Sequence, residues 1–415
     1  MHSFTIILNN KKIINDPVYG FISIPDGLVF SLIEHPYFQR LRHIKQLGLT
    51  HMVYPGSLHT RFHHAIGAMY LMDMAIETLR NKGHLISTEE EEAVIIAILL
   101  HDIGHGPFSH ALEHTIVSGI SHEDISALLM TRLNEHFHGR LTMAIDIFNG
   151  TYSRRFLHQL VSGQLDMDRL DYLNRDSFFT GVTEGLVGSD RIIKMLNLQG
   201  DEIVVEEKGI YSVEKFLIAR RLMYWQVYLH KTVIAAEQVL AKILVRAREL
   251  ALNGKKLFCT PALCHFLYRT ISREDFIHDG IHLETFAQLD DTDIMSAVKV
   301  WMDCDDVVLA TLCSNLVYRR LFHVDITNTA PDKEVVNVLL DKAAAHYNIT
   351  RTEAAYFVFT DTILNNAYRA DDTNIRILMK DNRSIDITTA SDNDNLTALS
   401  KTVKKYILCY AKHLI

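Results

Sequence analysis

The 415-residue chain can bury a large core, in one big domain plus a smaller one, since 48% of its residues are hydrophobic. A net charge of −8 and a pI of about 6.3 argue against a general attraction to nucleic acid or to an anionic membrane. No apolar run approaches the roughly 20 residues of a membrane span, and the N-terminus lacks a basic segment followed by an apolar one. We therefore expect a soluble, cytoplasmic protein that would bind an anionic substrate through a local basic pocket.

The cysteines indicate a reducing compartment. Their number is odd and none of them forms a CxxC pair, which fits reduced thiols and argues against a disulfide scaffold or a cysteine zinc site. They are Cys259, Cys264, Cys304, Cys313 and Cys409.

The chain begins with an alternating pattern that changes to a helical one. Residues 4–8 and 19–24 alternate apolar and polar side chains, which predicts short strands within residues 1–30. Over residues 31–252 the apolar side chains recur every three or four positions, which is typical of helices.

The clearest predicted helix begins near Ser87. This residue offers a capping hydroxyl, and the acidic residues 89–92 lie at the positive end of the helix dipole. Residues 93–100 are apolar on every side, so we expect this helix in the centre of the core. Gly and Pro residues between 104 and 107 end it just after His101-Asp102.

Further helices are predicted over residues 213–252, and the pattern changes again beyond residue 313. Strands are predicted at 320–326, 356–360 and 375–379, with a hairpin turn at 381–384 before a strand at 385–388. The chain is thus expected to be mainly α, with an N-terminal β segment (1–30), a helical domain (31–313) and a smaller C-terminal α+β module (314–415).

The most informative motif is His101-Asp102 at the end of the predicted buried helix. Adjacent imidazole and carboxylate groups can bind one ion from the last turn of a helix, whereas burying an unpaired carboxylate costs several kcal/mol. Three further histidines follow within a few residues, at His105, His110 and His114. This pattern indicates a metal site.

Two other segments complete such a site. Arg61 and His64 are three residues apart and share a helix face. Asp168, Tyr172 and Asp176 recur every four residues along another face, with Arg169 beside them. An N2O2 ligand set suited to Mn, Fe, Zn or Ni would then consist of His64, His101, Asp102 and Asp168. Such a set leaves open positions for water and a phosphate oxygen, as metal-assisted hydrolysis requires.

Residues 38–48, 54–64 and 101–110 carry a resemblance to a known family. Together with the H…HD…D order of the four candidate ligands, they resemble the HD-domain phosphohydrolases, and among these the dGTPase-like deoxynucleoside triphosphate triphosphohydrolases. The resemblance covers residues 13–235 and implies an all-helical core. It also implies that a dNTP is cleaved into deoxynucleoside and inorganic triphosphate.

The resemblance implies roles at the phosphates. The four candidate ligands would hold one metal ion, and Mg²⁺ could accompany the triphosphate. His105 and His122 would face the α-phosphate, where a histidine can protonate the leaving 5′ oxygen, and His110 would line the pocket nearby. The phosphate oxygens would be held by Arg61 and Arg169, with His230 and Lys231 in a further matching segment nearby.

The resemblance also implies how the sugar is bound. Gln46 and Asp176 would be placed for a 3′-hydroxyl, and Tyr172 would leave no room for a 2′-hydroxyl. Of the other polar residues in these segments, Asp166 and Asp171 are interpreted as surface or structural carboxylates, and His63 as a surface or packing residue.

The resemblance implies less about regulation and assembly than about the active site. Arg40 and Arg42 match positions that bind an activating nucleotide at a subunit interface in some relatives, but Glu34 and Phe21 depart from that pattern. The family implies a homo-oligomer, with a dimer as the minimal unit and a tetramer as the larger form. We expect no membrane and no nucleic acid among the partners.

Two alternatives stay open. The same metal site could act on a monophosphate, a cyclic nucleotide or a guanine alarmone. A nucleotide-sensing regulatory protein with a degenerate site is the other alternative, although it predicts the loss of ligands and none of the four is lost.

Overall fold

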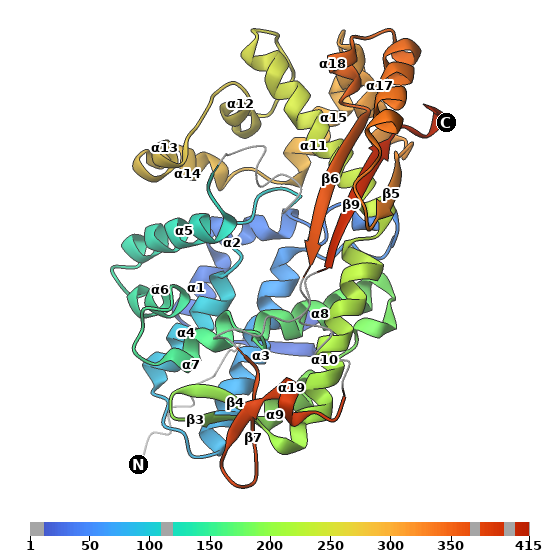
Figure 1. The fold of residues 1–415 in the computed structure, drawn as a ribbon. Helices are drawn as coiled ribbons and strands as arrows, with labels where there is room; N and C mark the ends of the chain where they lie inside the picture. Colours follow the sequence, from blue (N-terminus) through green and yellow to red (C-terminus); the bar gives the residue numbers. More distant parts are fainter. Residues whose placement is uncertain (1–11, 109–118, 366–373, 394–402, 415) are drawn as a thin grey trace.

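The computed structural model describes residues 12–108, 119–365, 374–393 and 403–414. Helices dominate these ranges, with small sheets at opposite ends of the molecule, which confirms the predicted fold class (Figure 1). The helices are α1 (Leu28–Glu34), α2 (Pro36–Gln39), α3 (Arg61–Asn81), α4 (Thr88–Leu100), α5 (His122–His136), α6 (Thr142–Phe148), α7 (Arg155–Val161), α8 (Met167–Thr180), α9 (Ser189–Met195), α10 (Ile210–Met223), α11 (Lys231–Leu252), α12 (Pro261–Leu267), α13 (Arg273–His278), α14 (Gly280–Phe286), α15 (Asp291–Trp301), α16 (Val307–Val317), α17 (Lys333–Tyr347), α18 (Arg351–Ala354) and α19 (Ile387–Ala390).

The strands of the same ranges form small sheets. Their bounds are β1 (Lys12–Asp16), β2 (Gly20–Ile24), β3 (Leu196–Gln199), β4 (Glu202–Glu206), β5 (His323–Thr327), β6 (Val358–Asn365), β7 (Arg376–Leu378), β8 (Ser384–Asp386) and β9 (Val403–Tyr410). β1 and β2 form a hairpin, a second sheet has the order β3-β4-β7-β8, and a third has the order β5-β9-β6.

Helix α4 lies at the centre of the core, as predicted. The Ser87 hydroxyl accepts a hydrogen bond from the Glu90 N–H at 3.1 Å, and the Glu90 carboxylate accepts one from the Ser87 N–H at 2.9 Å. These reciprocal bonds satisfy two of the free N–H groups at the helix start. Residues 93–100 are all buried, and α4 packs against α3, which in turn packs against α8. The three helices that carry the predicted ligands are therefore neighbours.

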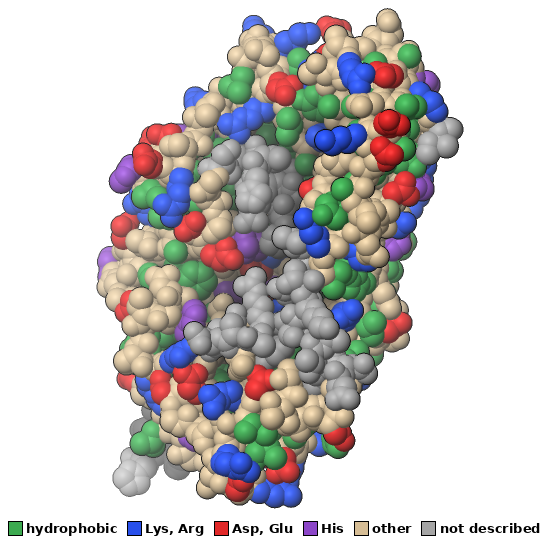
Figure 2. Space-filling model, in the orientation of Figure 1, with side chains coloured by type: hydrophobic (Ala, Val, Ile, Leu, Met, Phe, Trp, Pro, Cys, Tyr) green, Lys and Arg blue, Asp and Glu red, His purple; other side chains and the backbone are tan. Residues whose placement is uncertain are grey.

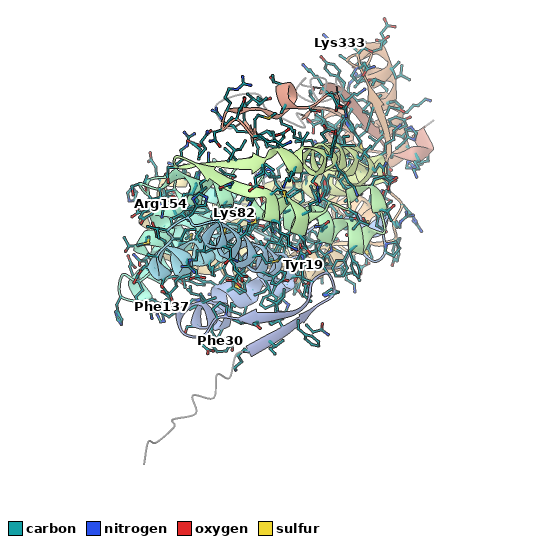
Figure 3. All side chains as sticks on the ribbon, turned by 90° about the horizontal axis from the view of Figure 1, so that it is seen from below. Tyr19, Phe30, Lys82, Phe137, Arg154 and Lys333 are labelled. Carbon is teal, nitrogen blue, oxygen red and sulfur yellow. A yellow bond between two sulfur atoms is a disulfide. The ribbon has the colours of Figure 1, made fainter. Side chains whose placement is uncertain are left out.

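The N-terminal hairpin lies against this helical core. The strand predicted at 19–24 is β2, and its partner is β1, whereas residues 4–8 lie outside the described residues. Tyr19, between the strands, contacts Tyr70 of α3, with the two rings tilted and their centroids 5.3 Å apart. In the view from below, the labels mark Tyr19 in the turn of the hairpin and Phe30 of α1, the helix that follows it (Figure 3).

The predicted helical region is interrupted in two places. The β3–β4 hairpin turns at Gly200, whose φ of +64° suits the left-handed region that glycine adopts without strain. The predicted helical block over 213–252 is divided into α10, a π-helical turn at Tyr224–Tyr228, and α11. Helix α11 begins with its own N-cap at His230, whose ring accepts a hydrogen bond from the Thr232 N–H at 3.2 Å.

The residues beyond 313 contribute to two separate sheets. β7 and β8 pair with each other as predicted, but β7 also pairs with β4 of the helical region, whereas β5, β6 and β9 form a sheet of their own. The strand predicted at 385–388 is short, because the Asp386 carboxylate accepts a bond from the Thr388 N–H and begins α19. The predicted domain boundaries are not tested by this arrangement and stay a prediction.

The cysteine prediction is wrong at one pair. Cys259 and Cys264 form a disulfide, with Cα atoms 5.3 Å apart, while Cys304, Cys313 and Cys409 are free. The first turn of α12 folds the chain back, so a spacing of five residues brings the two side chains together although no CxxC motif is present. Within the described ranges, no helix combines the length and hydropathy needed to span a membrane.

Candidate metal centre and adjoining cavity

Three of the four predicted ligands, His64, His101 and Asp168, form one cluster, and Asp102 lies beside both histidines while it also clusters with His105 and His122. His64 Nε2 lies 3.1 Å from Asp168 Oδ1 and 3.3 Å from His101 Nε2, and His101 Nε2 lies 3.4 Å from Asp102 Oδ1. His64 Nε2 and Asp102 Oδ2 are 3.7 Å apart. Ligands that each lie about 2.1 Å from one ion are roughly 3.0–3.4 Å from one another in tetrahedral or octahedral geometry. The spacing of the His64, His101 and Asp168 donor atoms therefore suits a single metal ion, with Asp102 next to it.

The second ring nitrogen of each histidine is also held. His64 Nδ1 lies 2.7 Å from Asp171 Oδ2, and His101 Nδ1 lies 2.6 Å from the carbonyl oxygen of Ile98. An ionised carboxylate and a carbonyl only accept hydrogen bonds, so both Nδ1 atoms carry a proton, and each Nε2, when it is not itself protonated, directs a lone pair into the centre. These lone pairs repel each other unless a proton or a metal ion lies between them. The donor set fits a divalent cation.

The electrostatics of the centre favour positive charge. Burial alone would lower the pKa of His64, but the carboxylates of Asp168 and Asp171 outweigh burial and raise this pKa to about 10. Burial opposes the ionisation of Asp168, yet His101 and His64 hold the pKa of this carboxyl well below its ordinary value. For Asp102, burial is outweighed by His101 and Arg61, which lower its pKa in the same way. Both carboxylates are therefore ionised at neutral pH.

A buried chain of ion pairs links His64 to the N-terminal hairpin. Asp171 accepts two hydrogen bonds from Arg175, both at 2.9 Å, and Arg175 donates a third at 2.7 Å to Asp16 of β1. A Cβ atom at Gly67 would lie 2.1 Å from Asp171 Oδ1, so only glycine leaves room for this network. Asp171 is structural, as predicted, but its contact with the His64 ring was not foreseen. Its position three residues after Asp168 on α8 was the available signal.

A cavity of about 450 Å³ opens beside the centre. In the space-filling view, histidine and acidic side chains are visible in a hollow in the middle of one face (Figure 2). Eight of the predicted site residues line this cavity, and they come from the loop before α3, the start of α3, the loop after α4, the start of α5, and α8. They are Gln46, Arg61, Asp102, His105, His122, Asp168, Tyr172 and Asp176.

The metal end of the cavity carries Arg61, His105 and His122. Arg61 donates a short hydrogen bond to Asp102 Oδ2, and His105 Nε2 lies 3.3 Å from Asp102 Oδ1. The rings of His105 and His122 stack with centroids 3.9 Å apart. Burial, reinforced by Arg61, holds the pKa of His105 well below its ordinary value, so its ring is neutral at pH 7.

Farther along α8, Asp176 is held from two sides. His59 Nε2 lies 2.8 Å from its Oδ1, and the Tyr228 hydroxyl donates to its Oδ2 at 2.7 Å. Tyr228 and Tyr224, four residues apart on the π-helical turn, both line the cavity, as does Glu237 of α11. The sequence prediction missed His59, Tyr224 and Glu237, and of these only the Tyr224–Tyr228 spacing gave a signal.

Besides the metal-cluster histidines His64 and His101, three described residues of the predicted site do not line this cavity. Arg169 pairs with Asp166 and donates to the Gly163 carbonyl oxygen at 2.6 Å, His230 caps α11, and Lys231 is exposed. His110 and His114 lie outside the described residues. The roles predicted for Arg169, His110, His230 and Lys231 stay predictions.

Arg40 is engaged inside the protein. Its guanidinium donates to the carbonyl oxygens of Ile103 at 2.8 Å, His105 at 2.9 Å and Leu289 at 3.0 Å, and the residue is 6% exposed. The resemblance implied that this position contacts an activating nucleotide. A side chain held in this way is not available for that contact. It instead fixes the backbone of the loop that follows His101-Asp102.

Two family models match these same segments. Residues 61–176 match the HD domain, and residues 187–258 match the HD associated region. A Bacillus subtilis (strain 168) protein of uncharacterised function, YwfO, is 34% identical over 76% of this chain and 72% of its own length. The chain belongs to the HD-domain family. The family predicted from the sequence is thereby confirmed.

Other members extend this comparison. The crystal structure of a phosphohydrolase from Bacteroides thetaiotaomicron VPI-5482 superposes on this HD-domain protein with a TM-score of 0.94, at 55% identity, covering 96% of this chain and 99% of the other. The deoxynucleoside triphosphate triphosphohydrolase SAMHD1 homolog of Dictyostelium discoideum is 31% identical over 57% of this chain. This HD-domain protein spans half of that relative's length.

Proposed function

We propose that this HD-domain protein hydrolyses deoxynucleoside triphosphates to deoxynucleosides and inorganic triphosphate. The observation that carries the proposal is one continuous cavity, in which the His/Asp cluster and Arg61 lie at one end and Tyr172 and Asp176 lie farther along α8. Support also comes from the SAMHD1 homolog and from the Bacteroides phosphohydrolase, to which the chain is similar.

The proposed metal ligands are His64, His101, Asp102 and Asp168. When bound, a divalent ion such as Mn, Fe, Zn or Ni would polarise a phosphoryl oxygen and lower the pKa of a bound water. The chain positions these ligands before any ion arrives, because Asp171 and the Ile98 carbonyl hold the two imidazole rings.

At the α-phosphate, Arg61 supplies a fixed positive charge, and His105 and His122 supply imidazole groups. His105 has a lowered pKa, so it would take up a proton only when the negative phosphates enter the cavity. It would then give that proton to the leaving 5′ oxygen. His122, stacked on His105, is the next candidate for this role.

At the sugar, Asp176 would accept a hydrogen bond from the 3′-hydroxyl, since His59 and Tyr228 already hold its carboxylate in place. Tyr172 would pack beneath the deoxyribose and exclude a 2′-hydroxyl, and Gln46 would bind the same edge of the sugar. For the outer phosphates we retain Arg169, His230 and Lys231. Arg169 would have to turn away from Asp166 to reach them.

The test is a substrate panel. The protein is incubated with Mn²⁺ and each dNTP, NTP, dNMP and cyclic nucleotide, and the products are separated by chromatography. We expect inorganic triphosphate and deoxynucleoside from dNTPs, little product from NTPs, and none of either from Asp102→Ala. Release of monophosphate, or a preference for cyclic nucleotides, would reject the proposal.

We also propose a homo-oligomer, with a dimer as the minimal unit. Light scattering at micromolar concentration, with and without nucleotide, tests this, and a monomer under both conditions would reject it. Cytoplasmic location and the absence of a nucleic-acid partner stay predictions.

A further inference from the structure

Glu237 places a carboxyl group in the part of the cavity that the proposed phosphate and sugar contacts leave unassigned. It lies in the second turn of α11 and lines the cavity together with Leu47, Gly48, Phe108 and Leu229. Its Oε1 comes within 3.8 Å of the position that a Cβ atom would occupy at Gly48. Gly48 follows Gln46, the proposed sugar contact, by two residues.

This carboxyl group has no partner within the described parts of the chain. It makes no hydrogen bond or ion pair there, and burial alone raises its pKa to about 7. Nearby, the Gln46 side-chain oxygen is buried and has no hydrogen-bond partner among the described residues, whereas Glu237 is half-buried and faces the cavity. Buried polar groups in proteins are nearly always paired, and a ligand is one explanation for those that are not.

The neighbouring groups narrow the identity of such a ligand. With the phosphates at the His/Asp cluster and the sugar beside Tyr172 and Asp176, the nucleobase is the part of the substrate left to occupy the remaining lining. That lining is apolar apart from Thr50, Glu237 and the hydroxyls of Tyr224 and Tyr228, so it offers surfaces on which a base can pack and one carboxyl group. The identification of the ligand as a nucleobase rests on the proposed function.

We propose that Glu237 recognises a guanine base by accepting hydrogen bonds from its N1–H and N2–H groups. These two adjacent donors on one edge of guanine match the two oxygens of a carboxylate. Hydrogen bonds to an ionised acceptor are roughly twice as strong as neutral ones, and bidentate geometry adds specificity.

The other bases fit less well. Adenine and cytosine present one amino donor beside a ring acceptor, so an ionised carboxylate gains one hydrogen bond and faces one lone pair. Thymine presents a single N–H between two carbonyl oxygens, which a carboxylate repels. The expected order of binding is therefore guanine first and thymine last.

Equilibrium titration without turnover tests the inference. dGTP, dATP, dCTP and dTTP are titrated calorimetrically into the wild-type protein, Glu237→Gln and Glu249→Gln in buffer with EDTA at pH 8, above the pKa of about 7 of the Glu237 carboxyl group. Glu249 lies on the same helix with its side chain 49% exposed and away from the cavity, so it is the matched control.

We expect the wild type and Glu249→Gln to bind dGTP at least tenfold more tightly than dTTP, and Glu237→Gln to lose 10- to 100-fold in dGTP affinity with little change for dTTP. An unchanged preference in Glu237→Gln, or no preference in the wild type, overturns the inference. The product assay with Mn²⁺ is separate: triphosphate release without any base preference would reject the role of Glu237 and leave the proposed function intact. Base-selective binding without triphosphate release would reject the proposed function and leave the role of Glu237 intact.

Discussion

The two ends of the cavity differ in how completely their polar side chains are paired. At the metal end His64 is held by Asp171, His101 by the Ile98 carbonyl and Asp102 by Arg61. At the far end Glu237 and the side-chain oxygen of Gln46 have no partner among the described residues. The polar side chains of the metal end are thus paired within the protein, whereas those of the far end have hydrogen-bonding groups that remain unused.

This difference has an energetic meaning. An unsatisfied buried polar group costs about 1–3 kcal/mol, so pairing at the metal end stabilises the folded protein and the lack of pairing at the far end does not. Variants at the metal end should thus impair metal binding, and variants at the far end should change ligand preference and stability.

The largest effect is expected for His64→Ala, which removes a ligand and leaves Asp171 without the ring that it holds. We expect this variant to lose the metal, measured by elemental analysis, together with all turnover. His63→Ala is the control, because His63 contacts Thr60 at the start of α3 and does not line the cavity. It should keep the metal and lose about 1 kcal/mol of stability through the weakened cap. Loss of metal from His63→Ala alone would contradict the assignment.

Asp171→Asn should weaken the centre without removing a ligand. The amide cannot accept from His64 and bind Arg175 as the carboxylate does, so the His64 ring loses its fixed orientation. We expect a 10- to 100-fold lower metal affinity in competition with a chelating dye. Gly67→Ala should act in the same direction, because its Cβ would collide with this carboxylate. Wild-type affinity in both variants would show that the buried chain does not position the ligand.

Arg40→Met tests the loop after His101-Asp102. The substitution leaves the carbonyl groups of Ile103, His105 and Leu289 without their donor, and we expect a loss of about 2–4 kcal/mol in urea denaturation. Arg42→Met is the control, since Arg42 is exposed, donates to Gln39 at 2.8 Å and lies over the Phe62 ring. It should cost no more than about 1 kcal/mol. Equal losses in the two variants would contradict the structural role of Arg40.

The smallest expected effect is a pH-dependent change at Glu237. Its pKa is about 7 in the folded protein, against an ordinary value of 4.5, because burial disfavours the ionised form. The folded state thus holds this proton to higher pH than the unfolded chain, and the associated stability is lost as the pH rises from about 4.5 through 7. Glu237→Gln should be more stable than the wild type at pH 8, by about 1–2 kcal/mol, and close to it at pH 5. Urea midpoints that differ equally at both pH values would contradict this.

The metal end could be predicted from the sequence because its information is local. Ser87 and Glu90 define the start of α4, a fully apolar stretch defines its burial, and His101-Asp102 follows at its end. The spacing of Arg61 and His64, and that of Asp168 and Asp176, puts each pair on one face of a helix. The order of these segments then matches a known family.

The far end could not be predicted in this way. Glu237 belongs to a helix whose sequence near it carries no motif, and only the tertiary fold brings it beside Gly48. The same holds for the pairing of β7 with β4 and for the Cys259–Cys264 disulfide, which depend on where distant or folded-back segments meet. Arg40 matched a family position in the sequence, but the backbone carbonyl groups that surround it in the fold determine its role.

The central claim is that water attacks the α-phosphorus of a dNTP at the His64, His101, Asp102 and Asp168 centre. The most direct measurement is hydrolysis of dGTP with Mn²⁺ in ¹⁸O-labelled water, followed by mass spectrometry of both products. We expect one ¹⁸O atom in the inorganic triphosphate and none in deoxyguanosine. Label in the deoxyguanosine, or formation of dGMP and pyrophosphate, would contradict this account.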